Sequence, residues 1–415
     1  MGIAWWNIES HRTWLSTEGI RILRFATNSS LTAVGFASLD SSGRPVQGAP
    51  QPTYVTSRMT HVFALAHLMG IPGAGLLVDR GVAALLSQAF DERHGGWFEF
   101  LAPTTEDQKK KTAYVHAFVL LAATSARLAQ RNDADELLSR VTEVIEERFW
   151  DEKAGRCVDA WSSDWEVLDN YRGANSNMHL VESFLALADS KGDVLWRDRA
   201  LRTAEFFTHD VAPRFEWRVP EHYNQHWEPL LEYGRGTPTH QFRPYGSTPG
   251  HWMEWSRLLL SIEAAYETPP PWLFMDAQAL FRTAIAMGWA VDGQDGFVYT
   301  LGWDNKPAVR SRPHWVVAEA IGAAATLGKR SQNSEYEHWY RKWWDYVSSN
   351  VIDETLGSWH HELDPTNQPK ETTWKGKPDV YHAFQATIIP QLPLISSLAG
   401  ALSGRQPGGA GVRLV

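Results

Sequence analysis

The chain has 415 residues, of which 43% are hydrophobic and 21% charged, values typical of a globular protein. Its 48 acidic and 39 basic residues give a net charge of −9, which argues against a nucleic-acid partner because phosphate binding requires a basic face. No stretch approaches the ~18 apolar residues of a membrane helix, and the first residues lack a secretory signal. With Cys157 as the single cysteine, the sequence predicts a cytoplasmic protein that contacts no membrane.

Short segments that combine an acid, a turn, a glycine and alternating aromatic residues recur along the chain, a pattern typical of β-hairpins. They begin at Asp40, Asp91, Asp151, Asp292 and Asp353, and residues 214–227 supply a sixth inside the longest gap. Helical stretches, with apolar residues three and four apart, lie between them, two to an interval. In chain order we expect helices at 9–26, 54–69, 74–90, 110–130, 133–149, 175–190, 194–211, 249–266, 272–288, 314–328, 333–350 and 380–400.

These helices pair into six units if the first helix of the chain closes a ring beside the last. The sequence therefore predicts an all-α fold, an (α/α)6 barrel of six helix pairs with short β-hairpins at one end. An open helical solenoid is the alternative, but it would leave terminal repeats that need polar caps. We expect residues 1–402 to form a single catalytic domain and residues 403–415, rich in Gly and Pro, to form a flexible tail.

The first helix of each pair carries a polar or aromatic residue that interrupts its apolar stripe. Taken one per helix, these residues recur at spacings of 56 to 72: Arg58, Tyr114, His179, His251, Trp315 and His382. A single buried Arg or His is usually structural, but packing alone does not demand six at a matched phase. Side chains at one phase of the inner helices converge on the barrel axis, which predicts a common pocket.

The segment 246–255 indicates how one of these histidines is held. Thr248 is a suitable N-cap and Pro249 suits the first helical position, so His251 lies in the first turn. Glu254 shares its helix face and can hold the imidazole ring, which suits proton transfer near neutral pH. His-x-x-Glu also matches half a metal site, but no His-Glu-x-x-His motif and no acidic ligand cluster accompanies it. We therefore expect no metal and no cofactor.

Tryptophan is unusually frequent, with 21 residues, several of them near histidines, glycines and acids. Core packing explains part of this number. The apolar face of a pyranose also stacks on a flat aromatic ring, so the tryptophans favour a carbohydrate-binding cleft.

Four segments together resemble the N-acylglucosamine 2-epimerase superfamily: residues 57–62 (SRMTHV), 173–183 (GANSNMHLVES), 250–255 (GHWMEW) and 379–382 (DVYH). They occur in the family's order, and the likeness runs from about Trp5 to Pro393. It is greatest for the aldose–ketose isomerase branch, the mannose and sulfoquinovose/mannose isomerases. The resemblance implies an (α/α)6 barrel, in agreement with the repeat pattern.

The resemblance also implies roles for individual residues. Two catalytic histidines of the family match His251 and His382, and an arginine that contacts the reacting oxygens matches Arg58. Glu254 and His179 belong to the same pocket, the first as a further catalytic group and the second as a substrate contact. The remaining positions at which relatives line the sugar site are Tyr114, Asn175, Trp315 and Glu319.

The function implied is a metal-independent aldose–ketose isomerase that interconverts D-mannose and D-fructose, with related aldoses such as lyxose as further substrates. The C2–H of an aldose is acidic only in the open-chain form, so the enzyme opens the ring and passes through an enediolate. We assign proton transfer between C2 and C1 to His382 and ring opening to His251, although these two roles are interchangeable at this point. The expected partner is a monosaccharide, and the expected state is a monomer or weak homodimer.

Other functions remain open. A sugar 2-epimerase needs a base on each face of the sugar, which two histidines can supply. A glycoside hydrolase needs paired carboxylates about 5–9 Å apart, for which Glu182, Glu254 and Glu319 are candidates. A sugar-binding module without activity would use the aromatic residues but not two phased histidines.

Overall fold

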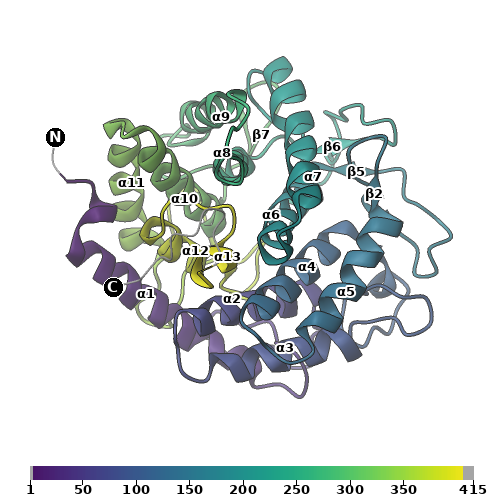
Figure 1. The fold of residues 1–415 in the computed structure, drawn as a ribbon. Helices are drawn as coiled ribbons and strands as arrows, with labels where there is room; N and C mark the ends of the chain where they lie inside the picture. Colours follow the sequence, from purple (N-terminus) through teal and green to yellow (C-terminus); the bar gives the residue numbers. More distant parts are fainter. Residues whose placement is uncertain (1–2, 405–415) are drawn as a thin grey trace.

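The computed structural model describes residues 3–404, and its helices form a ring of two layers (Figure 1). The inner helices are α2 (Thr53–Leu68), α4 (Ala113–Leu128), α6 (Ala174–Lys191), α8 (Pro249–Ala264), α10 (His314–Ser331) and α12 (Tyr381–Ile388). The outer helices are α1 (Glu9–Ala26), α3 (Ala74–Ser87), α5 (Ala134–Val144), α7 (Val194–Ala204), α9 (Trp272–Gly288) and α11 (Ser334–Tyr346). The predicted (α/α)6 barrel is confirmed, whereas the predicted tail lies outside the described residues from residue 405 onward.

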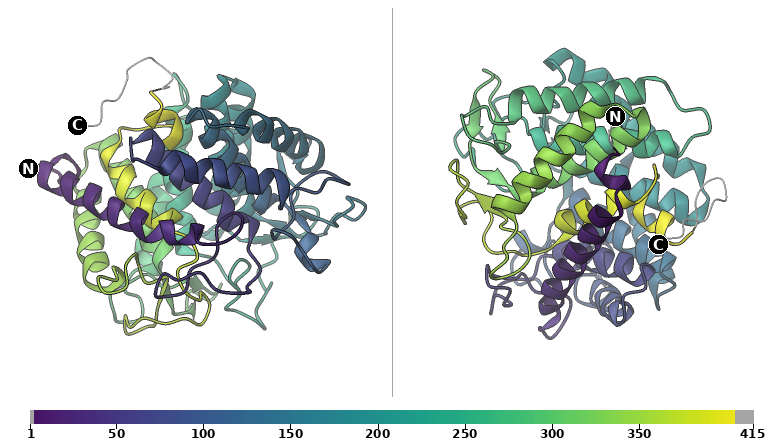
Figure 2. Two further views of the ribbon diagram at one scale, coloured as in Figure 1. Left: turned by 90° about the horizontal axis from the view of Figure 1, so that it is seen from below. Right: turned by 90° about the vertical axis from the view of Figure 1, so that its left-hand side faces the viewer.

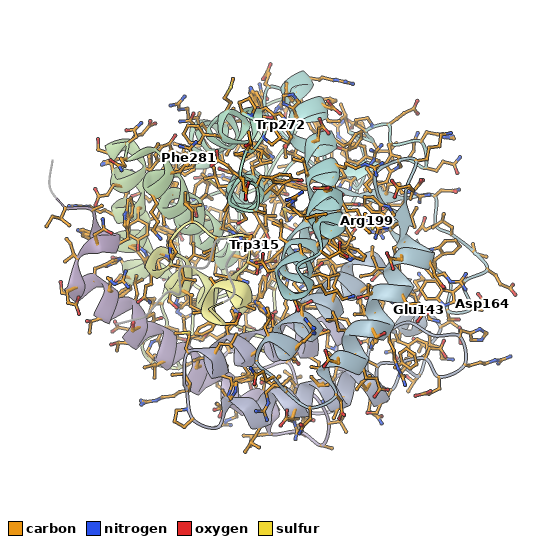
Figure 3. All side chains as sticks on the ribbon, in the orientation of Figure 1. Glu143, Asp164, Arg199, Trp272, Phe281 and Trp315 are labelled. Atoms are coloured by element: carbon orange, nitrogen blue, oxygen red, sulfur yellow. The ribbon has the colours of Figure 1, made fainter. Side chains whose placement is uncertain are left out.

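The two layers differ in sequence because they differ in burial. Every residue of α10 from His314 to Gly328 is buried, and this stretch is rich in alanine, so α10 packs on all sides. Outer helix α11 instead buries one stripe, at Tyr336, Tyr340, Trp343 and Trp344, with spacings of three and four. The hydrophobic core therefore lies between the layers, and Figure 3 shows Trp315 near the middle of the ring and Asp164 at its edge.

The ring closes where the first helix meets the last pair, as the sequence predicts. The two helices α1 and α12 lie side by side in both views of Figure 2. Gly19 permits the close approach, since a Cβ there would lie 3.0 Å from Oγ1 of Thr387. Trp359 Nε1 donates a hydrogen bond of 2.9 Å to Glu18, and Trp14 packs edge-on against Trp344. Residues far apart in the chain thus complete the barrel.

Short antiparallel strand pairs lie at the end of the ring where the inner helices begin. The pairs are β1 (Lys111–Thr112) with β4 (Ala160–Trp161), β2 (Trp150–Asp151) with β3 (Arg156–Cys157), β5 (Arg172–Gly173) with β6 (His222–Tyr223), β7 (Thr300–Leu301) with β8 (Pro307–Val309), and β9 (Arg312–Pro313) with β10 (Glu362–Leu363). Strands β1, β5 and β9 lead directly into α4, α6 and α10. Their partners precede the next inner helix, so these pairs hold the N-terminal ends of successive inner helices together.

Two predicted elements differ from the structure. The segment 380–400 is not one helix: α12 ends at Ile388, and α13 (Leu398–Leu402) follows only after Pro390 and Pro393, which lack the N–H that a continuing helix needs. The segment 214–227 does not pair with itself, because β6 within it pairs with β5 of the preceding repeat. No helix in the described range combines the length and apolarity that crossing a bilayer requires.

Candidate functional site

A cavity opens at the end of the ring where the inner helices begin. It encloses an empty volume of about 610 Å³. Eight of the nine predicted site residues line it, namely Arg58, Tyr114, Asn175, His179, His251, Glu254, Trp315 and His382. Four of these are the second residue of their helix, so the cavity faces several helix N-termini, whose partial positive charge favours an anion. The ninth residue, Glu319, lies behind this lining.

Glu319 contacts His382 instead of the cavity. Its Oε1 lies 2.9 Å from Nδ1 of His382, and its Oε2 accepts a hydrogen bond of 2.9 Å from Nε of Arg257. A carboxylate at Nδ1 holds the proton on that nitrogen and leaves Nε2 for the substrate. Burial and the nearby Arg58 guanidinium lower the pKa of His382 well below its ordinary value, so the ring is neutral near pH 7 and is available as a base.

His251 is held in a similar way, but by a residue that the sequence pattern did not reveal. Its Nδ1 lies 2.9 Å from Oε2 of Glu221, which immediately precedes β6. Glu254, expected to hold this ring because it shares the helix face, instead places its carboxylate toward His179. Thr248 is the N-cap residue of α8, as expected, but its side chain accepts no hydrogen bond from the first turn of that helix. The Thr248 backbone N–H instead donates to Oε1 of Glu221, at 3.2 Å.

Trp315 lies close to both imidazoles. Its ring centroid is 5.1 Å from that of His251 and 5.8 Å from that of His382, with interplanar angles of 32° and 37°. Gly250 makes room for the indole, because a Cβ there would lie 2.4 Å from Cζ3 of Trp315. The cavity therefore presents two imidazoles next to one flat apolar surface, a combination that suits a sugar.

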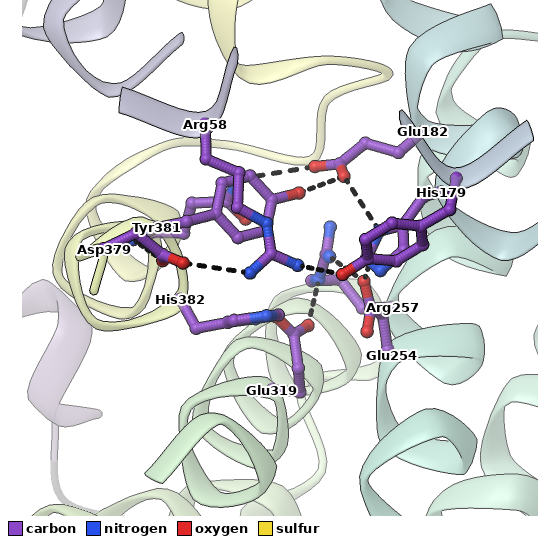
Figure 4. Close-up of polar contacts among 11 residues, drawn as sticks. Arg58, His179, Glu182, Glu254, Arg257, Glu319, Asp379, Tyr381 and His382 are labelled. Atoms are coloured by element: carbon purple, nitrogen blue, oxygen red, sulfur yellow. Dashed lines mark hydrogen bonds and ion pairs between the residues drawn. The ribbon is translucent and has the colours of Figure 1, made fainter. Parts of the chain in front are cut away.

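Arg58 is fixed at the cavity wall by a charge and a phenol. Its Nη1 lies 3.2 Å from Oδ2 of Asp379 and its Nη2 donates a hydrogen bond of 2.8 Å to the Tyr114 hydroxyl (Figure 4). The guanidinium also lies over the rings of Phe118 and Tyr381, 4.3 and 4.9 Å from their centroids. Arg58 is thereby positioned as a cation for negative charge that develops on a ligand.

Three carboxylates, those of Glu182, Glu254 and Glu319, lie around Arg257 at the barrel axis (Figure 4). Burial and the neighbouring Glu319 raise the pKa of Glu254 well above its ordinary value, which favours its protonated form. Burial lowers the pKa of His179 to about 4. One guanidinium cannot neutralise three buried carboxylates, and protonation of Glu254 relieves the excess charge.

One group of side chains in this cluster has the composition of a metal site. Ligand atoms of His179, Glu182 and Glu254 lie within 4.8 Å of one another. The sequence prediction of no metal did not foresee this group, because Glu182 and His179 come from α6 and Glu254 from α8. Arg257 lies 3.7 Å from Glu254, so a cation already occupies one side of the group.

The cavity also contains residues outside the predicted set. His314 and His361 stack with ring centroids 3.9 Å apart, and Tyr299, Trp374 and Asp379 add further polar and aromatic surface. His314 directly precedes Trp315 in the sequence, and Asp379 begins the segment 379–382 that ends at His382, so their positions are the signal that could have indicated them. Gln241 and Phe242 come from the long connection between β6 and α8, and no pattern in the sequence marks them.

This fold and site place the chain in a known class. The chain belongs to the N-acylglucosamine 2-epimerase family, whose sequence profile matches residues 35–386. Within the family it is similar to D-mannose isomerases. That of Thermobifida fusca is 53% identical over 401 residues, covering 96% of this chain and 98% of the relative. That of Pseudomonas cannabina pv. alisalensis is 49% identical over 407 residues, covering 97% of each. A crystal structure of a D-mannose isomerase aligns with a TM-score of 0.85 at 27% identity, covering 91% of this chain and 97% of that one.

Proposed function

We propose that this chain is an aldose–ketose isomerase that interconverts D-mannose and D-fructose. The observation that carries the proposal is the pair of carboxylate-bound imidazoles, His251 and His382, both near Trp315 in a cavity that also presents Arg58. The D-mannose isomerases at 53% and 49% identity support mannose as the aldose, and a related aldose such as lyxose is a further substrate of the same chemistry.

His382 is the base that moves the proton between adjacent carbons. Its ring is neutral, and Glu319 holds the proton on Nδ1, so Nε2 takes the proton from C2 of the open-chain aldose. The electrons form an enediolate, the hydroxyl proton of O2 passes to O1, and the proton on Nε2 returns to C1 to give the ketose. Arg58 stabilises the enediolate oxygens, an electrostatic contribution of roughly 3–4 kcal/mol for a well-placed donor.

Ring opening precedes this step and falls to the other side of the cavity. His251, bound to Glu221 through Nδ1, takes the proton from O1 as the C1–O5 bond breaks and returns it to O5. Glu254, whose pKa burial raises well above its ordinary value, lines the same cavity as a further proton-transfer group. Tyr114, Asn175, His179 and Trp315 complete the surface against which the sugar binds.

We further propose that the enzyme needs no metal, because the proton transfers above use only side chains. A reducing compartment such as the cytoplasm agrees with Cys157, a free and buried thiol. We also propose that the enzyme is a monomer or weak homodimer.

A sugar 2-epimerase is the second candidate, and one observation favours it. Both imidazoles line the cavity, so two bases are available to one bound sugar, as proton exchange at C2 from two faces requires. A glycoside hydrolase has less support. Its three candidate carboxylates are Glu182, Glu254 and Glu319, and among them only Glu254 lines the cavity.

Incubation of the purified protein with D-mannose separates these functions. We expect D-fructose, and with mannose deuterated at C2 we expect part of the label at C1 of fructose. The His382→Asn variant should lose about 10²–10⁴-fold in kcat while still binding sugar, since it removes the transferring base. His338→Asn, at an exposed histidine, is the matched control. Glucose as the main product would establish the epimerase instead, and unchanged mannose would refute both.

A further inference from the structure

Glu221 is a buried acid that reaches a catalytic histidine from outside the cavity. Glu221 is only 4% exposed, and it is not among the residues that line the cavity. One carboxylate oxygen lies 2.9 Å from Nδ1 of His251, and the other accepts the Thr248 backbone N–H at 3.2 Å. Glu221 therefore joins the start of α8 and the imidazole that α8 carries.

A purely structural explanation exists, because acids recur at this position in the repeat. Three acids, Glu99, Asp159 and Glu221, occupy equivalent positions in successive repeats. The residue after each acid pairs with the residue just before an inner helix, α2, α4 and α6 in turn. Glu99 accepts a hydrogen bond from the hydroxyl of Thr112, the N-cap of α4, and Asp159 accepts one from Ser176 in the first turn of α6. Each acid thus anchors the N-terminal end of the following inner helix. Among these three, Glu221 is the one whose second oxygen meets an imidazole.

The partners of the two histidines also differ. Glu319, which binds His382, shares its charge with the Arg257 guanidinium, whereas the second partner of Glu221 is a backbone N–H. A carboxylate whose charge no guanidinium offsets stabilises an adjacent imidazolium more strongly. The Glu221–His251 pair therefore suits an imidazole that holds a proton for part of the cycle, and the Glu319–His382 pair suits a neutral base.

We propose that Glu221 is the positioning residue for ring opening, an inference that rests on the proposed function of this site. By accepting Nδ1–H it fixes the tautomer of His251, so Nε2 faces the sugar. It then stabilises the imidazolium that forms when Nε2 takes the O1 proton and the C1–O5 bond breaks. The proton passes on to O5, and no net proton is gained or lost.

Ring opening can be measured separately from isomerisation. Polarimetry of freshly dissolved α-D-mannose reports enzyme-accelerated mutarotation, and fructose formation reports the complete reaction. In Glu221→Ala we expect both rates to fall by about 10²-fold, the lower end of the effect of losing a positioned acid–base group, with KM for mannose changed by less than about threefold. Added formate should restore part of both rates in Glu221→Ala, because it fits the space of the lost carboxylate, and none in Glu221→Gln.

The control is Glu99→Gln, which weakens the equivalent anchor of α4 without touching an imidazole. It should lower the melting temperature and leave both rates unchanged, with no response to formate. Equal rate losses in Glu99→Gln and Glu221→Gln would mean that Glu221 only anchors a helix, and the proposal would be wrong. So would near-normal mutarotation in a folded Glu221 variant. If the wild-type enzyme accelerates mutarotation but makes no fructose, the proposed function is wrong. The role of Glu221 in ring opening is then tested by the mutarotation rates of its variants.

Discussion

Replacement of Glu319 by glutamine should change the tautomer of His382 without emptying its site. The Glu319 carboxylate accepts two hydrogen bonds, one from Nδ1–H of His382 and one from Nε–H of Arg257. Glutamine has the same shape but a single acceptor oxygen. That oxygen will bind Arg257, which carries a permanent charge, and the amide N–H₂ will then face His382. The imidazole accepts at Nδ1, its proton moves to Nε2, and the nitrogen that faces the cavity can no longer act as a base.

The expected cost falls on kcat. A base in the wrong tautomer loses about 10²–10⁴-fold in turnover, whereas sugar affinity, which depends on the cavity lining, stays within about threefold. The free energy of unfolding falls by only about 1–3 kcal/mol, because Arg257 still donates one hydrogen bond to the amide oxygen and keeps its contact with Glu254. Initial rates with D-mannose give kcat, titration with the open-chain alditol D-mannitol gives affinity, and urea unfolding gives stability.

Glu263→Gln provides the matched control. Glu263 of α8 pairs with Arg330 of α10, the same two helices that carry Arg257 and Glu319, but it contacts no imidazole. It should leave kcat unchanged. Turnover within a few-fold of wild type in Glu319→Gln, with alditol binding intact, would show that Glu319 does not set the tautomer of His382.

Three further predictions concern metal, pH and packing. Exhaustive dialysis against EDTA should leave activity unchanged, despite the ligand atoms of His179, Glu182 and Glu254 lying within 4.8 Å, and a loss that Zn²⁺ or Mn²⁺ restores would contradict this. Burial and Arg58 lower the pKa of His382, so its neutral form persists as the pH falls. We therefore expect kcat/KM to stay level as the pH falls below about 6.5, the ordinary pKa of histidine. A decline in kcat/KM centred at or above that pH would contradict this prediction. Gly250→Ala puts a Cβ 2.4 Å from the Trp315 ring and should cost about 1–3 kcal/mol and most of the activity, while Gly236→Ala, with open space around it, should cost neither; urea unfolding and mannose turnover measure both.

The architecture was predictable because the barrel repeats. Apolar spacing located the starts of eleven of the twelve expected helices to within three residues, and it failed at 380–400, where Pro390 and Pro393 outweigh the helical pattern. The inner-helix site residues were predictable for a related reason. A residue near the start of each inner helix must point to the same end of the ring, so phase alone brings Arg58, His251 and His382 together.

Contacts between elements were harder to predict. Helix spacing assigned Glu254 to His251, yet the partner is Glu221, thirty residues before it in the chain. Spacing within one helix gives no information about a residue that approaches from a strand pair. Comparison of Glu99, Asp159 and Glu221 across repeats carries the missing signal, because each occupies the same place beside the next inner helix.

The joint between α1 and the last helix pair has a consequence for biosynthesis. Glu18 and Trp359, which bond across it, are 341 residues apart, so α1 leaves the ribosome long before its partners exist. At about 5–20 residues per second, α1 waits roughly 17–70 s with the face around Gly19 uncovered. His382 lies on α12, which is synthesised after Trp359, so a nascent chain gains its proposed base only once the partner of Glu18 already exists.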